Sequence, residues 1–584
     1  MIEEGKANVF DKPKAQRELA HFGLAIKRLN FFRTHIIDNI DMKLNKLILS
    51  AGLFAVAITG CTDLDVNVES QYTQDPSENS GIDPMIVVEA KMADVYFHLA
   101  GTLGRRYMEA QCLSSDEFTA LAFDGGYYDD GTYAHQALHN SYATDASLDW
   151  YSEVTAGITK TNTILEELGS SASVKMTAPA RAIRAYFTWI LMDSFGDAPI
   201  IDRLLGEGEV VQRSSRKDVA LWLEKELTEI IPELTEDVTE NTYGKPTKWM
   251  AQALLAKIYI NWPVYTADAP ELYDAATAVN DKLDDCISVC DEIINSGKFN
   301  LGTGKYADYL QKFSYDNDWK CEDFIYVMPY DAINRQGLQY ARPRTFKDMK
   351  NLLPNYYGSI DKFTQSFGGN MVLTPECVKR FSLNGDVRNL CILRSDVYNR
   401  DPKTLRPTSE PFMYKGAHVH FTEDIQLAKT DNTIDVGNNP QAIQQGCHSI
   451  KWFIVPQDYN NGRNQSNDLP IFRFADILLT KAEALVRNGQ SGAKELFNQI
   501  RSYAGAPTIS AEPSLNDIYE ERGREFFDEN WRRNDMVRFG HYEDEFFPHY
   551  KNFPDANFDK RHRIFPVEQE MLDLNPGWTQ NAGY

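Results

Sequence analysis

The sequence lacks three features, and each absence excludes a class of protein. Its eight cysteines are spread over 584 residues, which is not the dense framework of a small disulfide-held domain. The formal net charge of -24 argues against a general nucleic-acid role, because phosphate-binding surfaces need surplus Lys and Arg. Downstream of residue 61, no apolar run approaches the roughly 20 residues that span a bilayer. We therefore expect a large folded protein without a nucleic-acid partner.

The motifs of common enzyme families are also missing. There is no GxSxG elbow, no P-loop, and no GxGxxG ahead of a helix. His135 and His139 are four residues apart, but no Glu follows His135, so the zinc-protease pattern is absent. Acidic residues are plentiful, yet a glycosidase carboxylate pair is defined by geometry, and no pair is singled out by the sequence. The residues alone therefore carry no enzyme signature and indicate no catalytic metal or organic cofactor, while a glycosidase stays open.

Residues 42–61, which read MKLNKLILSAGLFAVAITGC, have the layout of a bacterial lipoprotein signal. Two lysines supply a positive start, and residues 47–58 form an apolar run of signal-peptide length. The ending Ile58-Thr59-Gly60-Cys61 resembles the lipobox, in which signal peptidase cuts before the cysteine and the thiol carries diacylglycerol. We therefore predict a signal peptide over residues 42–60 and lipidation of Cys61. Two or more acyl chains there would give stable membrane anchoring.

The segments on either side of this signal differ in character. Residues 1–41 are charged and only mildly amphipathic, and Met42 begins a complete signal by itself. We therefore interpret residues 1–41 as an upstream extension that comes from a wrongly assigned start codon. Residues 61–83 are polar and acidic, which is the composition of a flexible tether.

Helical periodicity dominates the chain from residue 84 onward. The expected helices cover residues 84–100, 148–168, 176–194, 215–234, 247–262, 283–295, 474–487, 491–504 and 515–530. Several form antiparallel-looking pairs joined by short turns, although no strict 34-residue repeat is visible. We predict a mainly α fold, in which tetratricopeptide-like helical hairpins form a superhelical scaffold.

The helical signal weakens in the middle of the chain. Glycine, proline, asparagine and aromatics increase there, together with short strand-like runs such as residues 324–327. We therefore predict a single domain over residues 84–584 with three parts. These are a helical scaffold of residues 84–298 and 471–545, a loop-rich insertion of residues 299–470 carrying short strands, and a C-terminal segment of residues 546–584.

Five short segments carry a resemblance to a known family. They are Arg184-Ala185-Tyr186-Phe187 with residues 193–199, Lys245-Pro246-Thr247-Lys248, residues 469–484, residues 521–525 with 531–538, and residues 575–584. In this order, after a lipobox, they resemble the SusD/RagB family, the surface lipoproteins of Bacteroidetes nutrient-uptake systems. The residues themselves indicate a structural role. We expect ion pairs between helices from Arg473 with Asp476, and from Glu521 with Arg524 and Arg532.

The resemblance implies a function. Proteins of this family are similar to lids on a SusC-like TonB-dependent transporter, to which they pass oligosaccharides or, in some members, other nutrients. It therefore implies an oligosaccharide ligand, a lipid anchor in the outer membrane facing the outside of the cell, and no catalysis. Two alternatives stay open: the same architecture capturing peptides or another nutrient, and a surface glycosidase.

The first candidate ligand site is the loop of residues 123–133, FDGGYYDDGTY. Its glycines make it pliable, and its tyrosines offer flat apolar faces beside carboxylates, which suits a sugar ring. The layout resembles the binding loop of glycan-binding relatives, with Tyr128 near the position where Trp is common. The expected ligand contacts are Tyr127, Tyr128, Asp129, Asp130 and Tyr133. The alternative is that the tyrosines pack the loop onto its own helices.

The second candidate site lies in the insertion and consists of Trp319, Tyr330 and Tyr340. The alternative is that these aromatics fill the core of an irregular region. Asp316 and Asp318 flank this site and could contribute oxygen ligands to calcium, but the full ligand spacing of an EF-hand loop is missing.

Overall fold

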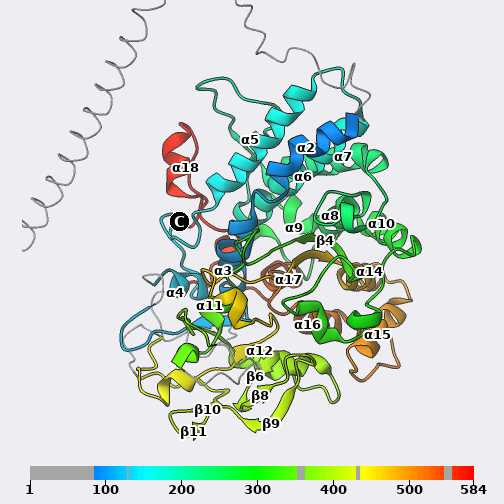
Figure 1. The fold of residues 1–584 in the computed structure, drawn as a ribbon. Helices are drawn as coiled ribbons and strands as arrows, with labels where there is room; N and C mark the ends of the chain where they lie inside the picture. The colour runs from blue at the N-terminus through cyan, green and yellow to red at the C-terminus, as the bar shows by residue number, and fades with distance from the viewer. Residues whose placement is uncertain (1–83, 128–130, 352–361, 429–433, 545–555) are drawn as a thin grey trace, which may run out of the picture. The chain divides into compact units, whose positions relative to one another are not determined.

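Helices are the dominant secondary structure of the described chain, and many of them pack in pairs (Figure 1). The computed structural model describes residues 84–127, 131–351, 362–428, 434–544 and 556–584. The predicted extension, signal peptide and tether, with Cys61, lie outside the described residues. So do Tyr128, Asp129 and Asp130. Residues 81–584 form one compact unit.

The N-terminal half is a series of neighbouring helices. In chain order they are α2 (Pro84–Tyr96), α5 (Tyr151–Leu168), α6 (Val174–Phe195), α7 (Arg216–Ile230), α8 (Lys248–Ile260) and α10 (Leu283–Asn295). From α5 to α10, each helix of this series packs against the one that follows it. The side chains of Ser215 and Thr247 cap α7 and α8 by accepting hydrogen bonds from main-chain N–H groups, which fixes where these helices begin.

The C-terminal helices close the stack. They are α14 (Phe474–Arg487), α15 (Ala493–Tyr503), α16 (Leu515–Glu525) and α17 (Arg532–Phe539). Helix α14 packs against α10 and α15, so helices far apart in the sequence are neighbours. The predicted mainly α fold with tetratricopeptide-like hairpins is confirmed.

Several predicted helix bounds differ from the structure by three or more residues, and two of these differences are informative. Helix α2 ends at Tyr96 rather than residue 100, and the chain continues through a π-helix (Thr102–Arg106) into α3 (Tyr107–Leu113). Gly101, directly after the predicted end of this helix, has helical φ and ψ angles. Helix α16 ends at Glu525 rather than residue 530, because Asp528 and Asn530 have φ angles of 59° and 71°, which an α-helix does not accommodate.

The strands are short, and every described sheet has two strands. The pairs are β1 (Phe118–Ala120) with β5 (Met371–Leu373), β2 (Ala198–Pro199) with β3 (Arg213–Ser214), β4 (Phe324–Met328) with β14 (Leu469–Arg473), β6 (Ile392–Leu393) with β13 (His448–Ser449), β7 (Ser395–Asp396) with β12 (His420–Phe421), β8 (Tyr398–Arg400) with β9 (Pro407–Pro411), and β10 (Met413–Tyr414) with β11 (Ala417–His418). Figure 1 shows β6 and β8 to β11 gathered at one end, away from α5 and α7.

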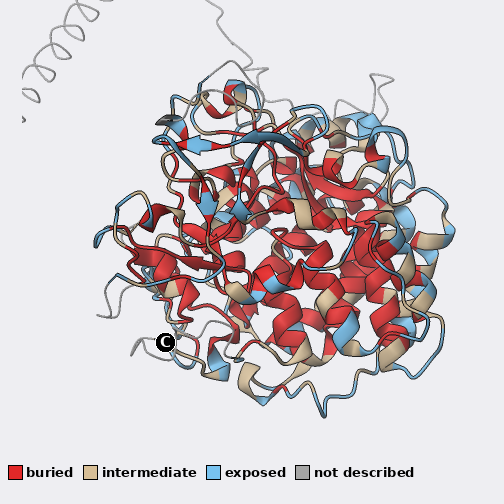
Figure 2. Cartoon of the chain, turned by 90° about the horizontal axis from the view of Figure 1, so that it is seen from below, coloured by how far each residue is buried: buried red, intermediate tan, exposed pale blue. Residues whose placement is uncertain are grey.

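Charged side chains are buried where the insertion meets α16 and α17. We call this group the ionic core: Asp116, Asp323, Arg380, Arg388, Arg473, Glu521, Glu525, Asp528, Glu529 and Arg532. Burial alone would raise the pKa of Asp116, but the guanidinium groups of Arg380 and Arg532 hold it well below its usual range. Figure 2 shows buried residues running through the helices, with exposed residues along the outer loops and strands.

The expected ion pairs were right in part. Glu521 and Arg524 are paired at 3.0 Å. Arg473, however, pairs with Asp323, Glu525 and Glu529, while Asp476 pairs with Lys257 and Arg522. Arg532 pairs with Asp116 rather than with Glu521. The reason is that Arg473 ends β14 while Asp476 lies in the first turn of α14, so their side chains meet different neighbours.

Candidate functional site

The first candidate loop begins with a tight turn just after β1. Phe123 and Gly126 exchange two main-chain hydrogen bonds, with N···O distances of 3.1 and 3.2 Å. The two central residues, Asp124 and Gly125, have φ angles of 56° and 78°. Positive φ at both positions is typical of the Asp-Gly turn of a β-hairpin. The loop was expected to be pliable, but this part of it is a defined turn with residues 124–126 exposed.

A buried carboxylate from a distant part of the chain holds this turn. Asp435 accepts hydrogen bonds from the main-chain N–H groups of Asp124, at 3.0 Å, and Gly125, at 2.5 Å. It also accepts from the N–H of Gly437 at 2.7 Å. The main chains of Ala122 and Asp435 also form an isolated parallel β-bridge. Because the carboxylate is used by main-chain donors, its role here is to position the turn.

Two further side chains frame the turn. Tyr127 is half-buried, and its hydroxyl accepts a hydrogen bond from the N–H of Ile434 at 2.8 Å. The ammonium of Lys347 lies 4.0 Å from the centre of the Phe123 ring and donates to Asn438 Oδ1 at 3.1 Å. Burial lowers the pKa of Lys347. The result is an exposed turn flanked by an aromatic ring and an amine, a combination that can contact an apolar sugar face and its hydroxyls.

The structure corrects three of the predicted ligand contacts. Tyr133, Tyr330 and Tyr340 are buried, with exposed fractions of 0%, 5% and 0%. The Tyr330 hydroxyl donates to the carbonyl of Ala100 at 2.7 Å, and the Tyr340 hydroxyl accepts from Asn530 at 2.9 Å. Their rings therefore pack the core and present no face to a ligand. For Tyr330 and Tyr340 this is the alternative given above, aromatics that fill the core of the insertion, and for Tyr133, which lies in α4 (Thr132–Ala137), it is packing onto a helix.

Trp319 differs from the two buried tyrosines of its candidate site. It is 38% exposed, and the ammonium of Lys320 lies 5.8 Å from its ring. The two carboxylates that precede Trp319 in the sequence already have partners. Asp316 pairs with Lys305 at 2.8 Å, and Asp318 accepts from the Tyr306 hydroxyl at 2.8 Å. Within the described ranges, no group of three or more His, Cys, Asp or Glu side chains could hold a metal ion.

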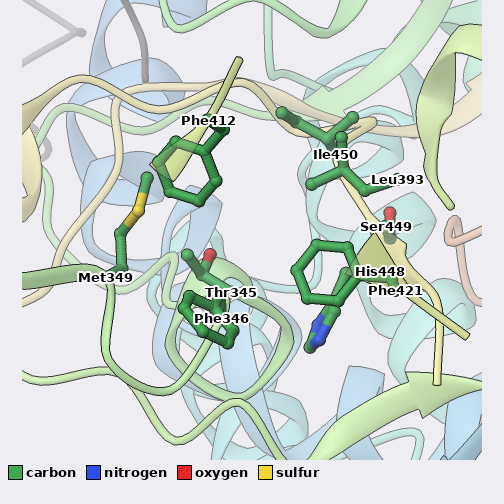
Figure 3. A pocket seen from close by; sticks show the side chains of 9 residues that line it. All are labelled: Thr345, Phe346, Met349, Leu393, Phe412, Phe421, His448, Ser449 and Ile450. Atoms are coloured by element: carbon green, nitrogen blue, oxygen red, sulfur yellow. The ribbon is translucent and has the colours of Figure 1, made fainter. Parts of the chain in front are cut away.

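A small apolar pocket adjoins the segment that carries Lys347 (Figure 3). Its lining residues are Thr345, Phe346, Met349, Leu393, Phe412, Phe421, His448, Ser449 and Ile450. The cavity measures ≈ 10 Å³, about the room of one water molecule, so it excludes a sugar ring. Burial lowers the pKa of His448 to about 4, and its Nδ1 donates to the carbonyl of Arg344.

Wider cavities lie on the helical scaffold. One of ≈ 410 Å³ lies between α10 and α14 and includes Tyr273, Val279 and Leu283. Another of ≈ 270 Å³ lies near the start of α7 and includes Asp197 and Arg216. Neither contains a residue of the predicted site. In the part of the chain that the structure describes, no helix is both long and apolar enough to cross a bilayer.

Two models of known protein families match this chain. A model described as "SusD family" matches residues 328–584. A second, described as "Starch-binding associating with outer membrane", matches residues 64–260. Between them the two models match most of the chain. The chain belongs to the SusD/RagB family.

Individual proteins match this chain at low sequence identity, and solved structures match its fold. The chain is 23% identical, over 452 residues, to the "Starch-binding protein SusD" of Bacteroides thetaiotaomicron, covering 73% of this chain and 76% of that protein. The structure of "Surface glycan-binding protein A" from the same organism, "in complex with laminarihexaose", matches with a TM-score of 0.60 at 17% identity. That match covers 85% of this chain and 99% of the other. A SusD homolog from this organism matches with a TM-score of 0.64 at 18% identity, covering 86% and 97%.

The sequence missed Asp435 and Lys347 as parts of the site. Asp435 lies in the run DVGNNP, which signals a turn but not the segment that it supports. The residues of the family motifs, in contrast, lie mainly in buried positions. Arg473, Glu521 and Arg532 belong to the ionic core, so they maintain the SusD scaffold and lie outside the candidate site.

Proposed function

We propose that this protein is a lipid-anchored protein of the outer membrane that faces the outside of the cell. There it captures oligosaccharide nutrients without transforming them and passes them to a partner SusC-like TonB-dependent transporter. Membership of the SusD/RagB family supports the general role. The names of the relatives, which include binders of starch and laminarin, support a glycan ligand. The lipobox at residues 58–61 supports anchoring through Cys61.

The observation that carries the ligand proposal is the exposed turn at Asp124 and Gly125. It is fixed by Asp435 and flanked by Tyr127. A fixed turn binds without a large ordering cost. Tyr128, Asp129 and Asp130 follow it directly in the sequence and remain proposed contacts. Trp319 remains a proposed contact from the second candidate site, because its ring is exposed.

A glycan array followed by product analysis tests the proposal. We expect binding to one class of oligosaccharide with no change in the ligand after prolonged incubation. Release of shorter products would favour a surface glycosidase. Binding to peptides and to no glycan would favour a carrier of another nutrient.

Co-purification from outer membranes with a TonB-dependent transporter tests the partner. Intact-mass analysis of the native protein tests the anchor, since a chain that retains Met1 would contradict lipidation of Cys61.

A further inference from the structure

Tyr142 is the most exposed aromatic residue in the described part of the chain, at 49%. It follows α4 (Thr132–Ala137), the short helix that comes directly after the candidate loop. Single exposed aromatic residues are common on protein surfaces. What distinguishes Tyr142 is that its position is fixed by several contacts at once.

A buried carboxylate organises these contacts. Asp145, which is 5% exposed, accepts a hydrogen bond from the N–H of Tyr142 at 2.8 Å. Its own N–H donates to the carbonyl of Tyr142 at 3.0 Å. The other oxygen of Asp145 accepts from Nδ1 of His135 at 2.8 Å. The His135 and Tyr142 rings meet edge to face, with centroids 4.8 Å apart and an interplanar angle of 87°.

Polar groups lie at the edge of the Tyr142 ring, and we call Tyr142 and His135 together the platform. The Tyr142 hydroxyl accepts a hydrogen bond from the side-chain amide of Asn140 at 3.2 Å. Since Nδ1 of His135 is used in the hydrogen bond to Asp145, the other ring nitrogen, Nε2, is the one that can make a further hydrogen bond. A flat ring with hydroxyl, amide and imidazole groups at its edge suits a pyranose, which presents an apolar face and a rim of hydroxyls.

Helix α4 connects this platform to the first candidate loop. At one end, Gly131 precedes the helix, and the Tyr127 ring lies against it, 3.8 Å from where a Cβ on Gly131 would be. Near the other end, His135 carries the contact with Tyr142. The two contacts, at Gly131 and at His135, are four residues apart, which is about 6 Å along a helix. A ligand that contacts both tyrosines therefore has to extend along the helix, as a chain of several sugar rings does.

We propose that Tyr142 and His135 form a second platform of the same binding site, so that the ligand is an oligosaccharide long enough to extend along α4. This inference rests on the proposed function. It adds a requirement that the proposed function does not contain. Affinity should increase with the length of the oligosaccharide, because only a longer ligand reaches Tyr142.

Binding of short and long glycans to matched variants tests the inference. The probes are maltose with maltohexaose and laminaribiose with laminarihexaose, measured by calorimetry on wild type, Y142A, Y142F and Y398A. Tyr398 in β8 is a matched control, because it is 37% exposed and also packs edge to face on a histidine, His418, at 5.1 Å. Figure 1 shows β8 apart from α4.

We expect Y142A to bind the preferred hexasaccharide roughly fivefold to tenfold more weakly and to leave the disaccharide unchanged. Y142F, which keeps the ring, and Y398A should stay near wild type, and Y142S provides a second ring deletion if Y142A does not fold. Wild-type affinity of Y142A for the hexasaccharide would overturn the second platform, and so would an equal loss for both lengths. Failure of the wild type to bind any glycan would instead overturn the proposed function, and the inference with it.

Discussion

The side chain of Asp435 accepts a hydrogen bond from the main-chain N–H of Asp124, 311 residues earlier in the sequence. The second oxygen accepts from Gly125. The carboxylate is fully buried, whereas the turn that it holds is exposed. A segment near the end of the insertion therefore sets the conformation of the candidate binding loop.

Replacement of Asp435 by alanine should release this turn. The main-chain donors of residues 124 and 125 lose their acceptor, so the turn should open more often, with a modest stability cost of about 1–3 kcal/mol. Amide hydrogen exchange should accelerate at residues 123–127, and glycan affinity should fall with it. D396A, which removes an exposed carboxylate from the same insertion, serves as the control. Unchanged exchange in D435A would contradict a positioning role for Asp435.

The ionic core predicts a large effect at Arg473. This buried guanidinium binds Glu529 through two hydrogen bonds of 2.8 Å and also pairs with Asp323 and Glu525. R473A leaves these carboxylates buried without one of their cations, which typically costs about 3–5 kcal/mol. Urea unfolding should show a midpoint far below wild type. R203A, which breaks an exposed pair with Glu209, should unfold near the wild-type midpoint. Similar midpoints for the two variants would contradict the role of the ionic core.

Asp468 should make stability depend on pH. Burial raises its pKa to about 7, and it accepts hydrogen bonds from the Tyr243 hydroxyl at 2.7 Å and the N–H of Tyr330 at 2.8 Å. The Asp468 carboxyl of the folded protein therefore stays protonated at pH values at which the same carboxyl of the unfolded chain is already ionised. Its contribution to stability is therefore present at low pH and is lost as pH rises toward 7.

The variant D468N removes this titration. Its free energy of unfolding should exceed that of wild type by roughly 1–3 kcal/mol at pH 8, and the gain should shrink toward pH 4. D424N, at an exposed position, is the control. A D468N gain that is the same at pH 5 and pH 8 would show that Asp468 does not titrate in this range.

Local signals in the sequence predicted much of the scaffold. Helices α10 and α14 have the predicted bounds, residues 283–295 and 474–487, because apolar periodicity and end signals agree there. The strand signal at residues 324–327 also corresponds to β4. The end of α16 was missed because Asp528 and Asn530, which have positive φ angles, contact Ser449 and Tyr340, residues that lie far from them in the sequence.

The candidate site was harder to predict, because exposure of an aromatic ring depends on tertiary packing. Tyr133 lies in the first turn of α4 and Tyr142 follows that helix, and each is an aromatic residue with polar neighbours in the sequence. Tyr133 is buried, whereas Tyr142 is half exposed. The contact from Asp435 joins residues more than 300 positions apart, and periodicity carries no information at that separation.

The C-terminal segment predicts a final stability effect. The amide of Asn581 donates to the carbonyls of Phe195 at 2.8 Å and Phe565 at 2.7 Å, and its oxygen accepts from Arg213 at 2.6 Å. N581A would remove all three contacts at once and take this donor from the carbonyl of Phe565, at a cost of about 1–3 kcal/mol. Thermal unfolding should therefore shift down by several degrees. N575A, which removes one hydrogen bond from a half-buried position, should shift it much less. Equal shifts would mean that the three contacts of Asn581 contribute no more than a single surface hydrogen bond.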